Sequence, residues 1–179
     1  EAYEADQLRA KQEADRKKAL RHSKVDKLKP GKTLYLQGKY YKAIDALEAF
    51  LKISDMDEDL IKEATSMLQD SKTMLLQATT PLLSKARSFK EGEDLKQAYE
   101  TYGEVLVYDP SNEEALDERN KIFNMLRNRS MKVYREGLIS ESLSLFSEAK
   151  EKFQEVQQIS PINSEYYIKA TEKLQKYLD

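Results

Sequence analysis

The sequence contains no cysteine, one histidine, five glycines and four prolines among its 179 residues. Without cysteine it can form neither a disulfide framework nor a reactive thiolate. The one imidazole, at His22, cannot form a zinc site or be assigned as a general base without a partner. No apolar run approaches the roughly 18 residues of a membrane helix, and the charged N-terminus lacks the apolar core of a signal peptide. We therefore expect a soluble fragment, and we predict no metal site and no cofactor.

Two short motifs that could carry chemistry are incomplete. Residues 31–33 (Gly-Lys-Thr) resemble the end of a phosphate-binding loop, but Asp26 stands where the earlier glycine should be. Residues 55–59 offer the oxygen ligands of the first half of a calcium loop, but Leu60 replaces its turn glycine and Ser66 its bidentate glutamate. We interpret the first as a helix break and the second as an acidic turn that caps the next helix. With no nucleophile motif and no distinctive pair of acids, we predict no catalytic residue and no enzyme activity.

Charged residues make up 35% of the chain and hydrophobic residues 40%. Together with the scarcity of helix breakers and of period-two alternation, this composition predicts an all-α fold of long helices. The net charge of −2 hides a gradient, because residues 1–32 hold ten Lys or Arg against six Asp or Glu.

Five cations of this basic region are candidates for an electrostatic contact: Arg16, Lys17, Lys18, Arg21 and Lys24. Several cations within about four helical turns create a strong local potential. They could form a solvated helix face, or contact an acidic protein, an anionic membrane or nucleic-acid phosphates. The run has no interleaved aromatic residues and no base-reading motif, so nucleic-acid binding is the weakest of these alternatives.

Apolar positions at helical spacing divide the chain into about seven helices. A charged helix or connector is expected to end where Pro30 and Gly31 break or kink it, and the remainder to form one repeat domain. Pro81 is expected to start a new helix and Gly137 to end one. The predicted segments are the N-terminal helix at 1–29, then the repeat domain at 30–179 with hairpins at about 30–55, 58–110 and 113–161 and a capping helix at 164–178.

One segment carries a recognisable set of small and aromatic positions. They are Ala86, Phe89, Leu95, Ala98, Tyr102 and Leu106, followed by Asp109 and Pro110. This pattern resembles a tetratricopeptide repeat (TPR), and the segment from Gly31 to Asp55 is similar. The unit endings at Asp55, Pro110 and Pro161 lie 55 and 51 residues apart, whereas the family's repeat has about 34 residues. The chain therefore looks like a divergent TPR-like array with lengthened helices.

The resemblance implies antiparallel helix hairpins stacked as a TPR-like superhelix. Family members are generally non-enzymatic and hold peptides or partner helices along a groove lined by the first helix of each pair. The groove positions that the resemblance implies here are Lys32, Tyr35, Leu83, Arg87, Lys90, Arg127 and Tyr134. The family's clamp for a terminal carboxylate needs lysine and asparagine at places that Leu28, Lys32, Leu83 and Arg87 occupy, so that binding mode is not supported.

The leading hypothesis is thus a protein-binding scaffold or adaptor whose partner is another protein or a peptide. The alternative is an architectural spacer or a coiled-coil element that self-associates through the first helix. A membrane contact would require an anchor upstream of Glu1. The sequence does not assign a compartment, although the charge-rich repeat style suggests a bacterial scaffold of the cytoplasm or the envelope.

Overall fold

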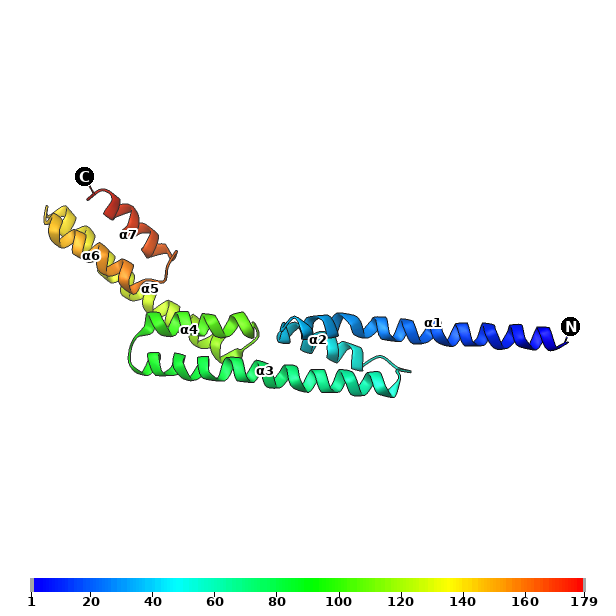
Figure 1. Cartoon of the computed structure of the whole chain (residues 1–179). Coiled ribbons are helices and arrows are strands. Elements are labelled where there is room, and N and C mark those ends of the chain that lie inside the picture. The colour runs from blue at the N-terminus through cyan, green and yellow to red at the C-terminus, as the bar shows by residue number, and fades with distance from the viewer. Residues whose placement is uncertain (1, 179) are drawn as a thin grey trace. The chain divides into compact units, whose positions relative to one another are not determined.

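The computed structural model describes residues 2–178, which contain seven α-helices and no strand (Figure 1). The prediction of an all-α fold with seven helices is confirmed. The helices are α1 (Ala2–Leu36), α2 (Tyr40–Leu51), α3 (Glu58–Glu91), α4 (Leu95–Tyr108), α5 (Glu113–Ser142), α6 (Phe146–Ile159) and α7 (Glu165–Gln175).

The chain divides into two compact units, one ending at Ala78 and the other beginning at Thr79. The division falls inside α3, so that each unit takes part of this helix. Each unit has its own apolar core, as the following paragraphs describe. The stacking of all the hairpins into one superhelix stays a prediction.

The core of the first unit forms where α1, α2 and the first half of α3 meet. Its buried side chains are Leu28, Ala43, Leu47, Phe50, Leu60, Ala64 and Met67. Residues 3–20 of α1 take no part in this core, because every one of them is exposed. The first unit is therefore a small three-helix core from which a long charged helical segment extends.

The second unit holds two buried clusters. The first lies among the end of α3, α4 and the first half of α5, and consists of Ala86, Leu95, Ala98, Tyr102, Val105, Ala115, Ile122 and Leu126. The second lies among α5, α6 and α7, around Ala149, Phe153, Val156 and Ala170. Because α5 contributes to both clusters, it is the central element of this unit.

The three hairpins follow one register, which begins at a small residue of the longer helix. This residue is Gly31 in α1, Ala86 in α3 and Gly137 in α5, and it is buried in every case. Seven residues later the backbone has a positive φ in each hairpin, at Gly38 (71°), Glu93 (60°) and Ser144 (60°). The left-handed residue turns the chain so that the shorter helix can return along the longer one.

The register continues through the shorter helix of each hairpin. A fully buried alanine lies twelve residues after the small residue, and larger buried side chains lie sixteen and nineteen residues after it. The alanines are Ala43, Ala98 and Ala149; the larger residues are Leu47, Tyr102 and Phe153, followed by Phe50, Val105 and Val156. Gly137 therefore corresponds to Gly31, whereas the sequence interpretation treated it as the residue that ends a helix.

Three expected helix ends are wrong. Helix α1 passes through Pro30 to Leu36, α3 passes through Pro81 to Glu91, and α5 passes through Gly137 to Ser142. Proline removes one backbone hydrogen bond, but core side chains on both sides hold each helix in place, such as Leu28 and Leu34 around Pro30. Gly137 lies inside α5, where its lack of a side chain leaves room for the ring of Phe153.

Candidate partner-binding surface

The groove residues predicted in the first unit, Lys32 and Tyr35, both face α3. The Nζ atom of Lys32 lies 2.5 Å from Oε1 of Glu63. The hydroxyl of Tyr35 donates a hydrogen bond to Oδ2 of Asp70 at 3.2 Å, and this bond raises the pKa of the tyrosine. Both predicted side chains are thus engaged by acidic residues of the following long helix.

The same arrangement recurs in the second unit, between α3 and α5. Arg87 donates two hydrogen bonds to Glu114, from Nε at 2.6 Å and from Nη2 at 2.5 Å. Lys90 pairs with Glu118. The paired cations hold the pKa of both carboxyl groups below the usual glutamate value, because each favours the ionised form. The third predicted residue, Leu83, packs against the core instead.

An open depression of about 380 Å³ lies along this row of ion pairs. It is lined by Arg87, Lys90, Glu91, Tyr102, Glu114 and Glu118. Desolvation raises the pKa of the buried Tyr102, and the neighbouring carboxylates act in the same direction. The surface therefore offers charges of both signs, already paired with each other, above a buried aromatic ring.

The last two predicted groove residues lie on α5 and face α7. Arg127 places Nη2 at 3.1 Å from Oε2 of Glu165. Tyr134 is half-buried and packs against the core, with its ring centroid 5.4 Å from that of Phe153 and 5.7 Å from that of Tyr166. Tyr134 thus contributes to packing in this unit.

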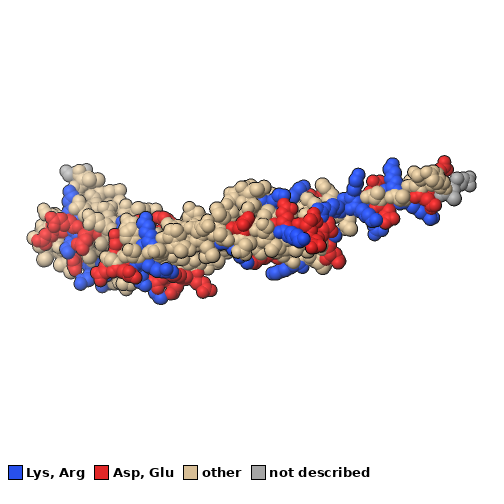
Figure 2. All heavy atoms as spheres, turned by 60° about the horizontal axis from the view of Figure 1, so that its bottom comes forward, with Lys and Arg blue, Asp and Glu red and all other residues tan. Residues whose placement is uncertain are grey.

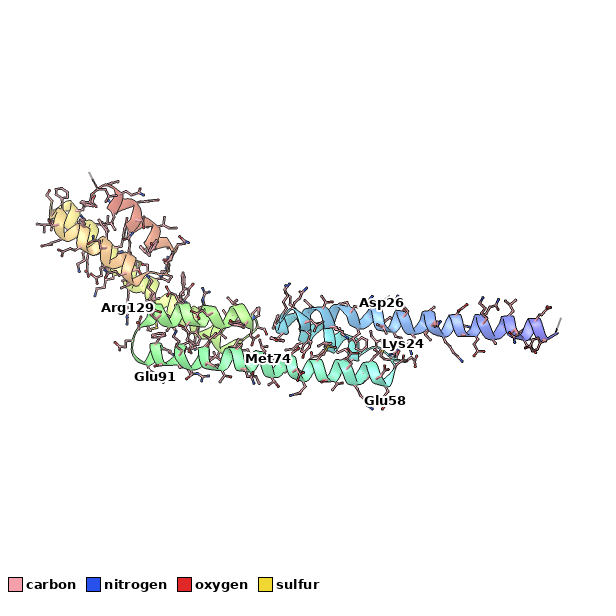
Figure 3. The ribbon with its side chains drawn as sticks, viewed as in Figure 1. Lys24, Asp26, Glu58, Met74, Glu91 and Arg129 are labelled. Atoms are coloured by element: carbon pink, nitrogen blue, oxygen red, sulfur yellow. The ribbon has the colours of Figure 1, made fainter. Side chains whose placement is uncertain are left out.

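Two of the five cations of the predicted basic run are held within the first unit. Arg21 pairs with Asp57 and Asp59, and the Nζ atom of Lys24 lies 2.7 Å from Oδ1 of Asp57. Figure 3 shows Lys24 beside the segment that leads into α3. Lys24 first, and then Arg21, lowers the pKa of Asp57. The acidic turn predicted before α3 therefore binds cations of α1, which sequence reasoning missed.

The other three cations, Arg16, Lys17 and Lys18, belong to the exposed part of α1. Lys17 pairs with Glu13 at 3.0 Å. Figure 2 shows basic and acidic side chains mixed along this helix, so its visible face does not present one sign of charge. This mixture weakens the case for a contact with nucleic acid or an anionic membrane.

A second depression of the second unit lies between α4 and α5 and has a volume of about 260 Å³. Its lining residues are Tyr99, Leu106, Leu116, Arg119, Asn120 and Phe123. The guanidinium carbon of Arg119 lies 4.1 Å from the ring centroid of Tyr99. Sequence reasoning missed this site, for which Gly103, a glycine in the interior of α4, is a signal because glycine is unfavourable inside a helix.

Within residues 2–178, no group of three or more His, Asp or Glu side chains is placed to hold a metal ion. In the same part of the chain, no helix combines the length and the apolar character needed to cross a membrane.

Comparisons with protein-family models, with curated proteins and with solved structures give no match to this chain.

Proposed function

We propose that the chain is a non-enzymatic, TPR-like scaffold that binds another polypeptide along the exposed sides of its helix hairpins. The observation that carries this proposal is the shared register of the three hairpins. Their buried positions repeat, whereas the exposed residue that directly follows the small buried residue differs: it is Lys32 in the first hairpin, Arg87 in the second and Leu138 in the third. A framework that repeats its core and varies its surface is typical of helical repeat proteins that present extended binding surfaces.

The depression between α3 and α5 is the proposed binding surface of the second unit. The side chains of Arg87 and Glu114 are 55% and 34% exposed. Exposed ion pairs of this kind contribute little to stability, about 0 to 1 kcal/mol. Arg87 and Glu114 can therefore exchange their mutual contact for contacts with a polar partner at small cost.

The test is a selection of displayed random peptides on the immobilised chain, followed by affinity measurements with individual peptides. Arg87→Glu combined with Lys90→Glu should abolish binding of peptides that use this surface, because both cations become anions beside Glu114 and Glu118. If no peptide is selected, or if the selected peptides bind this variant as well as the wild type, the assignment of the surface is wrong.

A charge-swapped variant, Arg87→Glu with Glu114→Arg, serves as the matched control. It keeps an ion pair between α3 and α5 while exchanging its two charges. We expect it to fold like the wild type and still to lose affinity for the selected peptides. Recovery of full affinity by the swap would show that the pair matters only for stability.

A second function, self-association or spacing through α1, is favoured by the exposure of residues 3–20 on all sides of that helix. Light scattering on the full chain and on a chain without residues 1–18 tests it. The cut leaves Arg21, Lys24 and the core residue Leu28 in place. A mass of two or more copies for the full chain, with the mass of one copy for the shortened chain, would support self-association. A mass of one copy for both chains over a wide concentration range would rule it out.

A further inference from the structure

We propose that the depression between α4 and α5 binds a carboxylate of the partner polypeptide, flanked by apolar side chains, through the guanidinium of Arg119. This inference rests on the proposed scaffold function and names the chemistry of one ligand. The site, here called the Arg119 groove, consists of the six lining residues given above. It is distinct from the depression between α3 and α5, which has none of these residues in its lining.

The position of Arg119 is set by its neighbours in α4. Its guanidinium lies over the ring of Tyr99, at 4.1 Å from carbon to centroid. The ring of Phe123, one helical turn further along α5, lies 5.9 Å from that of Tyr99. Arg119 thus continues an aromatic stack that joins the two helices, and its charged group is pre-organised before any ligand arrives.

Gly103 provides the space for this arrangement. A Cβ atom at position 103 would lie only 3.2 Å from Nε of Arg119 and 3.6 Å from its Nη2. Glycine is unfavourable inside a helix, and here it permits the guanidinium to lie directly against the backbone of α4. This close approach accounts for a glycine that the helix itself does not need.

Within the described residues, the Nε atom of Arg119 is buried and has no hydrogen-bond partner. The acids that flank it in sequence are engaged elsewhere, since Glu118 pairs with Lys90 and Asp117 with Lys121. Because Arg119 lines an open depression, a carboxylate that enters it can accept charge-assisted hydrogen bonds from the terminal N–H groups of the guanidinium.

The remainder of the groove indicates what accompanies the carboxylate. Leu116 is 49% exposed, and Leu106 and Phe123 lie beside it in the lining. Asn120 is exposed and can both donate to and accept from a peptide backbone. An acidic residue next to leucine or phenylalanine, within an extended or helical peptide, matches this combination of charge and apolar area.

The experiment selects displayed random peptides in parallel on the full-length wild type and on Arg119→Gln. We expect peptides enriched on the wild type alone to carry Asp or Glu next to an apolar residue. Their affinity should fall by roughly 10- to 100-fold on Arg119→Gln, as expected for the loss of charge-assisted hydrogen bonds. The matched control is Arg129→Gln, the same change at an exposed arginine of α5 (Figure 3), which should bind like the wild type.

Two further measurements protect the result from a folding artefact. Replacing Asp by Asn in the selected peptide leaves the protein untouched and should reduce affinity to the same extent. Gly103→Ala should also weaken binding, because the added methyl group displaces the guanidinium.

Selected peptides without an acid, or with equal affinity for wild type and Arg119→Gln, would overturn the proposal. If the selected peptides lose affinity for the Arg87→Glu/Lys90→Glu variant but not for Arg119→Gln, this inference is wrong and the scaffold function stands. If the selection yields no peptide, the scaffold function is wrong too.

Discussion

Gly31 and Gly137 lie where a side chain of the shorter helix packs directly against the longer helix of its hairpin. A Cβ atom added at Gly31 would lie 2.8 Å from Cδ2 of Leu47, and one at Gly137 would lie 2.7 Å from Cε1 of Phe153. The corresponding residue of the second hairpin is Ala86, so the hairpin geometry itself admits a methyl group. The need for glycine therefore comes from the particular side chain that packs against it.

The substitution Gly137→Ala should destabilise the second unit by about 1 to 3 kcal/mol, the usual cost of overpacking a core. The ring of Phe153 is fully buried, so the added methyl group would force it against its neighbours. Unfolding in denaturant measures the effect. Gly92→Ala is the control, because the nearest atom to its added Cβ is at an ordinary 3.4 Å, and it should change stability by less than about 0.5 kcal/mol. Equal effects of the two substitutions would contradict the packing argument.

Stability should also fall in acid through the pairs between α3 and α5. In the folded chain, Arg87 lowers the pKa of Glu114 and Lys90 lowers that of Glu118, below the ordinary value of 4.5. As the pH falls through 4.5, the unfolded chain takes up protons that the folded chain does not yet bind. The stabilisation by these pairs is thus complete above this pH. It is lost as the pH drops towards the lowered pKa values that the two glutamates have in the folded chain.

Thermal unfolding between pH 7 and pH 3 measures this dependence. We expect the melting temperature of the double variant Glu114→Gln/Glu118→Gln to fall less steeply in acid than that of the wild type. The control Glu104→Gln removes an exposed acid of α4 and should keep the wild-type profile. Parallel profiles for the wild type and the double variant would show that these pairs do not contribute.

At the scale of helices, the sequence predicts that a helix exists better than it predicts where the helix ends, as the two interior prolines show. The helical spacing of apolar positions correctly predicted about seven helices. The breaks at Pro30 and Pro81 were wrong, because a proline's local cost is visible in sequence while the core that offsets it is not. Helix boundaries here are decided by contacts between distant residues.

The substitution Pro30→Ala should stabilise the first unit by up to about 3 kcal/mol. Alanine restores an N–H group that can donate to the backbone carbonyl of Asp26, and the side chain of residue 30 is exposed. Unfolding in denaturant measures whether the free energy of unfolding rises or falls. Pro110→Ala is the matched control outside a helix, and there we expect a loss of about 0.4 to 1 kcal/mol from the greater freedom of the unfolded chain. A destabilised Pro30→Ala variant would mean that the proline is required by the fold.

The same limit applies to the candidate surface. The resemblance implied Lys32, Arg87 and Lys90 as groove residues, but it did not indicate that each would pair with an acidic residue of the next long helix. Arg87 and Glu114 lie 27 residues apart in sequence, and no periodicity of a single helix reveals such a pair. The Arg119 groove was hidden for the same reason, since Gly103 becomes informative only when α5 is placed beside it.

For the whole molecule, the division into two units with separate cores predicts local rather than global effects of core mutations. Leu47→Ala removes a fully buried side chain from the first unit and Phe153→Ala one from the second. Each should cost about 2 to 5 kcal/mol. Hydrogen exchange read by mass spectrometry should show faster exchange in α1 and α2 for Leu47→Ala, and in α5 and α6 for Phe153→Ala. Faster exchange throughout the chain in both variants would indicate a single cooperative unit.

The common register has a consequence for the spacing between hairpins. The stretch from the small residue to the second large core residue spans the same number of positions in every hairpin, as in Gly31 to Phe50 and Gly137 to Val156. The hairpin starts are 55 and 51 residues apart, a difference of four, which is about one α-helical turn. A difference of one whole turn between the small residues keeps the buried positions of α3 and α5 on nearly the same face of each helix, because four residues advance an α-helix by slightly more than one turn. The spacing between hairpins can therefore differ while the register inside each hairpin stays the same.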